Sequence, residues 1–170
     1  MTDSFQNLSI DSFPDISKIT FKSIEKAFLK VILTNVSLVF TILFIGLFFI
    51  LKYQIEEDIS EFVPYFYIGL FLVFLAVLIM KIIGFKKRKY AVREKDISYK
   101  SGIFFKKMTT VPFTRIQHIE VDEGPISRFF KLASLSVFTA GDSSDDLEIK
   151  GIKKETALKI KEFVSQKIDE

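Results

Sequence analysis

The residues whose type and spacing could do chemistry are basic, and they lie beside a long apolar segment. Lys86, Lys87, Arg88 and Lys89 form an unbroken run directly after it. Basic side chains next to a membrane attract anionic lipid headgroups by about 1 kcal/mol per charge. The run is therefore a candidate headgroup contact. The alternative is that these four residues serve only as a signal for membrane topology.

Residues suited to catalysis or metal binding are scarce. The chain of 170 residues has no cysteine and one histidine, which excludes disulfides and thiolate metal sites and leaves little room for a His-based site. The usual phosphate-loop, dinucleotide, nucleophile-elbow and zinc-protease motifs do not occur. Asp145 and Asp146 are adjacent in a predicted loop and point apart, which is unsuitable for paired acid–base catalysis. We expect no catalytic residue, no metal site and no cofactor.

Two further polar side chains are expected to be structural. His118 lies in a predicted strand, where it would share a face with Ile116 and Glu120. Arg128 is expected to pair with a nearby carboxylate such as Glu123.

Two apolar segments must position the basic run. Residues 31–51 are twenty-one residues without a charge, and residues 62–80 are nineteen more. At 1.5 Å per residue the first segment spans roughly 30 Å, the thickness of a hydrocarbon core. Lys81 can extend its ammonium group to the surface, so the second span can continue beyond it. The sequence predicts a transmembrane hairpin over residues 31–85, with helices at 31–51 and 62–83.

The distribution of charge predicts the orientation of this hairpin. The link at 52–61 carries one Lys and four acidic residues, whereas residues 81–95 carry seven basic residues. Because cytoplasmic flanks are enriched in Lys and Arg, both termini are expected in the cytoplasm and the short link outside. The charge of residues 81–170, nineteen basic against thirteen acidic, also suggests a domain held against an anionic surface.

The segment before the first span is polar and then helical in its spacing. Residues 1–17 carry no basic residue and do not resemble a secretory signal. From residue 17 to 30, Ile24, Ala27 and Phe28 share a face, and a lysine recurs every four residues on another. Residues 1–30 are thus expected to hold a polar segment and an amphipathic lead-in at the membrane surface. The first turns of the following helix are an equal alternative.

After residue 89 the apolar period changes from helical to two. Ser101-Gly102 is a turn signal followed by Ile103 and Phe105 in alternation, residues 122–125 form another turn, and residues 141–146 are a hairpin loop. These short strands predict an antiparallel sheet that curls or closes. The apolar stripe of the last segment predicts a helix that covers the open end of the sheet; it consists of Ala157, Ile160, Val164 and Ile168.

An ordered series of short motifs in residues 88–150 resembles the bacterial pleckstrin-homology-like (YdbS-like) membrane proteins. The series begins with Tyr90-Ala91-Val92 and ends with Thr139-Ala140-Gly141. Between them lie Gly102, the stretch from Pro112 through Ile116 and Gln117, Gly124-Pro125, Arg128 and Ala133-Ser134-Leu135.

The resemblance implies a partly open, antiparallel β-barrel of pleckstrin-homology type over residues 88–170, capped by the C-terminal helix. With the hairpin, this makes a membrane-anchored α+β protein. Some domains of this type bind lipids through a basic loop cluster, which would involve Lys100, Lys106 and Lys107 here. The chain departs from the family at Lys131, where relatives commonly have the glycine that a left-handed backbone favours. Either Lys131 is strained or the turn differs.

Three functions follow as hypotheses. The first is a non-enzymatic, membrane-anchored module for protein interaction or assembly in the bacterial cytoplasmic membrane. The second is a reader of anionic lipid headgroups, and the third is an accessory subunit of a membrane enzyme or transporter. The expected partners are membrane lipids and an unidentified membrane or cytoplasmic protein, with a homo-oligomer as an option and no nucleic acid.

Overall fold

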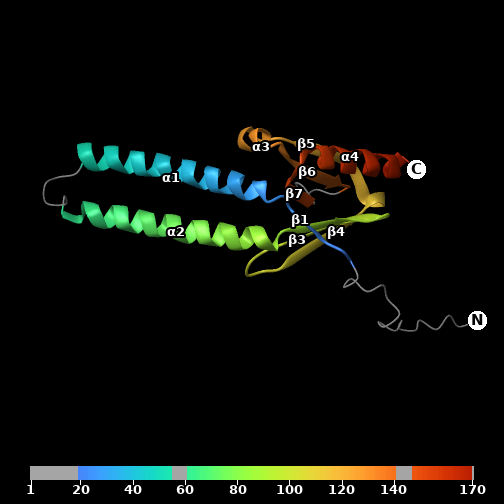
Figure 1. Cartoon of the computed structure of the whole chain (residues 1–170), viewed down its shortest axis with the longest axis horizontal. Coiled ribbons are helices and arrows are strands. Elements are labelled where there is room, and N and C mark those ends of the chain that lie inside the picture. Colours follow the sequence, from blue (N-terminus) through green and yellow to red (C-terminus); the bar gives the residue numbers. More distant parts are fainter. Residues whose placement is uncertain (1–18, 55–60, 141–146, 170) are drawn as a thin grey trace, which may run out of the picture.

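The computed structural model describes residues 19–54, 61–140 and 147–169, as two long helices followed by a small α+β domain (Figure 1). Gly141, Asp145, Asp146 and the expected loop at 141–146 lie outside the described residues. The elements are β1 (Lys22–Ser23), α1 (Ala27–Gln54), α2 (Val63–Lys87), β2 (Lys89–Val92), β3 (Asp96–Ser101), β4 (Lys107–Pro112), a 3-10 turn (Phe113–Arg115), β5 (Ile116–Asp122), α3 (Pro125–Phe129), β6 (Leu132–Thr139), β7 (Leu147–Lys153) and α4 (Lys154–Asp169).

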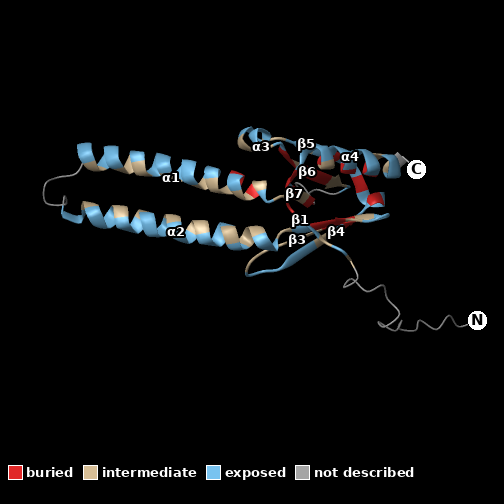
Figure 2. Ribbon diagram, viewed as in Figure 1, coloured by how far each residue is buried: buried red, intermediate tan, exposed pale blue. Residues whose placement is uncertain are grey.

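Helices α1 and α2 lie side by side and form the membrane hairpin that the sequence predicts. Phe40 packs on Phe74 with ring centroids 5.0 Å apart, and Phe44 stacks on Tyr67. Both helices are long and apolar enough to cross a membrane, and no residue of α2 is buried (Figure 2). Apolar side chains that the protein itself leaves uncovered suit a lipid environment.

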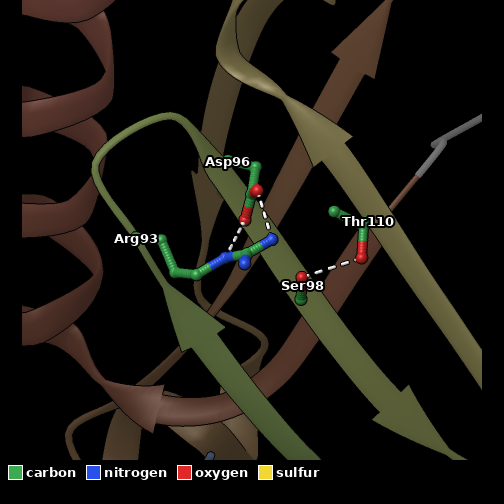
Figure 3. Close-up of polar contacts among 4 residues, drawn as sticks. All are labelled: Arg93, Asp96, Ser98 and Thr110. Atoms are coloured by element: carbon green, nitrogen blue, oxygen red, sulfur yellow. Dashed lines mark hydrogen bonds and ion pairs between the residues drawn. The ribbon is translucent and has the colours of Figure 1, made fainter. Parts of the chain in front are cut away.

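The domain is built from two antiparallel sheets, with strand orders β1-β2-β3-β4 and β5-β6-β7. They do not join into a closed barrel, as expected for a partly open one. Two polar contacts in the first sheet are drawn in Figure 3. Arg93 and Asp96 form a two-pronged ion pair across the β2–β3 turn, and the hydroxyl oxygens of Ser98 and Thr110 lie 2.8 Å apart between β3 and β4.

Helix α4 covers the β5-β6-β7 sheet with the predicted stripe. Ala157, Ile160 and Val164 are buried, and Ile168 packs against the same core. The ring of Phe163 meets Phe113 edge to face at 5.9 Å, which joins α4 to the 3-10 turn between the two sheets. The predicted C-terminal cap is thus confirmed.

The prediction of an amphipathic, helical lead-in at the membrane surface is wrong for residues 19–26. Lys22–Ser23 pairs with β2 as a short strand, and the helix begins only at Ala27. Ile24, Phe28 and Val31 are buried in the core of the domain, and not at a membrane surface. The helical spacing is real only from Ala27 on, because Phe28 and Val31 lie in α1 whereas Ile24 precedes the helix. The domain therefore draws its core from both sides of the hairpin.

Two local expectations also differ. His118 shares a face with Glu120 but not with Ile116, because a bulge between residues 116 and 118 shifts the register of β5. Ile116 is buried, whereas the exposed ring of His118 stacks on Phe138 at 4.3 Å. Ile103 and Phe105 are not in a strand: the turn extends from residue 102 to 106, and β4 starts at Lys107.

Lys131 has a left-handed backbone conformation, with φ of +55°. Its N–H donates to the carbonyl of Arg128 at 3.0 Å, and its own carbonyl accepts from the N–H of Lys154 at 3.1 Å. Lys131 therefore occupies a conformation that favours glycine, and it carries the strain.

Candidate functional site

Four of the seven candidate headgroup residues surround one cavity. Lys87 is the last residue of α2, and Lys100 comes from the end of β3. Lys106 ends the β3–β4 turn, and Lys107 begins β4. The cavity has a volume of about 220 Å³ and is also lined by Ser101, Gly102 and Met108. Because Lys87 ends a membrane-spanning helix, the cavity lies at the membrane side of the domain.

The conformation of Gly102 creates this arrangement. Its φ is +111°, and a Cβ there would lie 1.8 Å from the carbonyl oxygen of Phe105. Only glycine lets the chain turn so tightly against itself. The turn brings the lysines that follow it back toward Lys100, whose strand pairs with β4 in the register Lys100 with Met108.

The cavity is electropositive. No acidic residue occurs between residues 97 and 119, and none lines the cavity. Within the described part of the chain, no carboxylate forms an ion pair with any of the four lysines. The ammonium group of Lys100 lies 3.9 Å from the ring centroid of Phe21, a cation–π contact that orients the charge without neutralising it.

The remaining basic candidates lie close by but do not line this cavity. Lys86 is exposed in the last turn of α2, and Lys89 is exposed in β2. Arg88 caps α2 and places its guanidinium 5.9 Å from the ring centroid of Phe28. Arg88 lines a neighbouring cavity of about 270 Å³ between α2 and the β3–β4 turn.

Tyr99, next to Lys100 on β3, is partly buried. Burial raises the pKa of its phenol above the ordinary value of 10.0; Arg88 acts in the opposite direction, and Glu148 raises it. Because neighbouring residues of a strand point to opposite faces, and Tyr99 does not line the cavity, its hydroxyl group is not part of the lysine cluster.

The expected pair between Arg128 and Glu123 is not formed. The carboxylate of Glu123 instead accepts from the ammonium group of Lys154 at 2.6 Å. Arg128 and Glu123 both line a cavity of about 610 Å³ at the start of α4, with acidic and basic side chains mixed around it. Among the described residues, no three His, Asp or Glu side chains gather closely enough to hold a metal ion.

The described family-motif residues lie in or next to the helices and strands of the domain. Tyr90, Ile116 and Leu135 are buried, and Pro125 begins α3 after Gly124. Pro112 ends β4, Gln117 is exposed at the bulge of β5, and Thr139 ends β6. What the sequence reasoning missed is the exposure of Phe104 and Phe105. Two aromatic residues followed directly by two lysines were a signal for this exposure. It was overlooked because Phe105 was assigned to a strand.

Comparison with known proteins agrees with this architecture. A region of 64 residues is 34% identical to the UPF0699 transmembrane protein YdbS of Bacillus subtilis (strain 168), covering 38% of this chain and 40% of that protein. A second region, of 101 residues, is 28% identical to the UPF0699 transmembrane protein YdbT of the same organism. It covers 59% of this chain and 20% of that protein. The chain thus aligns with less than half the length of either relative.

A more distant similarity links the chain to a crystal structure. It is a DUF1696 family protein with a pleckstrin-homology domain from Shewanella loihica PV-4, with 19% identity and a TM-score of 0.36 over 46% of this chain and 68% of the other. The family model for the bacterial PH domain matches residues 20–168, from β1 to α4 and including both spans. The chain therefore belongs to the bacterial PH domain family.

Proposed function

We propose that this chain is a non-enzymatic, membrane-anchored module whose domain binds phosphate-bearing anions, chiefly lipid headgroups, at the cytoplasmic membrane surface. The observation that carries this proposal is the convergence of Lys87, Lys100, Lys106 and Lys107 on one cavity without a carboxylate. Their position at the end of α2 supports a membrane source for the anion. The orientation is the one that the excess of basic residues after α2 predicts.

This proposal moves the headgroup hypothesis ahead of protein interaction. A topology signal requires only that basic residues lie near the end of a span, and Lys86 and Lys89 satisfy that requirement. It does not require lysines from a distant hairpin to meet the last residue of α2. Convergence of this kind instead suits an anion, because several ammonium groups can share one phosphate.

The test uses the full chain in a neutral detergent. Thermal unfolding is followed at physiological ionic strength with short-chain phosphatidylglycerol, phosphatidylcholine or glycerol 3-phosphate added. A ligand that binds only the folded state raises the melting temperature by mass action. We expect phosphatidylglycerol to raise it and phosphatidylcholine to leave it unchanged. An effect of glycerol 3-phosphate as large as that of the lipid would indicate a soluble anion as the natural ligand.

The variant Lys106→Gln/Lys107→Gln should lose this stabilisation. Lys159→Gln/Lys161→Gln is the matched control, because it removes the same charge from exposed positions of α4. Equal stabilisation of both variants by phosphatidylglycerol would argue against the cavity as the binding site.

Protein interaction is the second candidate, and the edge of β4 favours it. This strand ends the four-stranded sheet, and an edge strand can pair with a strand of another chain. The hypothesis expects a partner that co-purifies in mild detergent and remains with the lysine variant. Loss with the lysine variant would instead support the anion site.

A further inference from the structure

Three phenylalanine rings of the domain are almost fully in contact with solvent. Phe104 is 78% exposed, Phe105 89% and Phe129 83%, more than any other large hydrophobic residue outside the spans in the described ranges. Burying such a ring contributes roughly 1.5–3 kcal/mol, so leaving three of them in water is unfavourable. Exposed apolar groups beside polar ones typically mark an interaction surface.

The tip of the β3–β4 turn, residues 103–105, lies beside the end of a membrane span. A Cβ on Gly84 of α2 would be 3.2 Å from Cδ1 of Ile103. Met80, Lys81 and Gly84 face Ser101, Gly102 and Ile103 across a cavity of about 270 Å³. In Figure 1 the turn between β3 and β4 projects back alongside the end of α2.

The length of α2 sets the depth of this contact. The helix has 25 residues, or about 37 Å at 1.5 Å per residue. Since a hydrocarbon core is about 30 Å thick, the last one or two turns of α2 emerge into the headgroup layer. Gly84 lies in the last turn, and so the tip that packs on it lies at the same boundary.

The charges around the tip fit this location. Lys106 and Lys107 follow the two aromatic residues directly, and Lys86 and Lys87 end the helix beside them. Aromatic rings bordered by lysines are typical of segments that lie in the interface of an anionic membrane. On the other side of the domain, α3 packs against α1 and ends at Phe129.

We propose that Phe104 and Phe105 insert into the interface of the bilayer that α2 spans. Lys106 and Lys107 lie in its headgroup layer, and Phe129 makes a second contact beside α1. The domain thereby contacts the membrane at points beyond its two spans. This proposal goes beyond the anion site, because insertion depends on apolar contact and persists in a neutral bilayer.

The composition of the chain provides the experiment. Because the sequence has no tryptophan, Phe105→Trp introduces a single indole fluorophore at an exposed position. The full chain is reconstituted in phosphatidylcholine vesicles with and without lipids brominated near the headgroup. Phe104→Trp is the second variant. Phe163→Trp is the control, because α4 extends away from the spans (Figure 1).

Insertion predicts a blue-shifted tryptophan emission at positions 104 and 105. Brominated lipid should quench most of the fluorescence intensity at these two positions and none of it at position 163. Emission typical of water at both tip positions would overturn the proposal. So would a blue shift without bromine quenching, because a protein surface would then cover the rings. Combining Phe105→Trp with Lys106→Gln/Lys107→Gln separates the two proposals: quenching that persists shows insertion whether or not the anion site exists.

Discussion

The ring of Phe28 lies so close to Gly151 that a Cβ on this glycine would be 2.2 Å from Cγ of the ring. Phe28 is the second residue of α1, and Gly151 belongs to β7. The N–H of Glu25 donates to the carbonyl of Gly151 at 2.9 Å. The first spanning helix is therefore packed into the sheet of the domain and is not joined to it by a free linker.

Gly151→Ala should destabilise the protein strongly. The methyl group would collide with Phe28, and the φ of +82° is one that side-chain-bearing residues rarely adopt. Overpacking and backbone strain together should cost about 2–4 kcal/mol. Thermal unfolding of the full chain in detergent measures the loss. Gly124→Ala is the control, since its nearest neighbour would be 4.0 Å away; equal effects of the two would contradict this explanation.

A fragment of residues 88–170 should not fold. It lacks β1 and three buried apolar side chains of the core, Ile24, Phe28 and Val31. Losing each large side chain from a core costs about 2–5 kcal/mol, which together exceeds the stability of a small domain. Dispersion of the amide resonances in an NMR spectrum would show this directly.

A matched chain should restore folding without the membrane. Residues 20–32 joined to residues 85–169 by a glycine–serine linker keep both halves of the core. We expect dispersed resonances from this chain and collapsed ones from the fragment. If the fragment alone folds, the N-terminal residues are not part of the domain.

The Ser98–Thr110 pair should behave as a unit. Ser98 is fully buried, and its hydroxyl lies 2.8 Å from that of Thr110 (Figure 3). Thr110→Val leaves this hydroxyl without its partner, at a cost of about 1–2 kcal/mol. Ser98→Ala/Thr110→Val should be more stable than Thr110→Val alone, as a double-mutant cycle by chemical denaturation would reveal. Additive losses would show that the two hydroxyls do not interact.

The parts predicted correctly from the sequence are those with long, consistent patterns. The charge-free runs, the two-residue period and the stripe of α4 each repeat over many residues, so one exception does not change the interpretation. β1 is only two residues long, and its pairing with β2 depends on a return of the chain from the membrane. The apolar runs predict that return, but no local pattern predicts that two residues on one side of it pair with a strand on the other.

The candidate site shows the same limit. The sequence identified each basic candidate, but not which of these residues line the same cavity. Gly102 indicated a turn, whereas the length of that turn follows from the contact between its backbone and Phe105. His118 was assigned to the wrong face because one bulge reverses the alternation along a strand.

Lys131→Gly should stabilise the protein, although it removes a side chain. Lys131 is the one non-glycine residue with positive φ in the described ranges, at +55°. A left-handed backbone costs a side-chain-bearing residue roughly 1–2 kcal/mol, and the greater freedom of glycine in the unfolded chain offsets part of that gain. The net gain in the free energy of unfolding should be about 1 kcal/mol. Lys131→Ala keeps the Cβ and therefore the strain, so it should bring no gain; a gain as large as that of the glycine variant would place the effect in the lysine side chain instead.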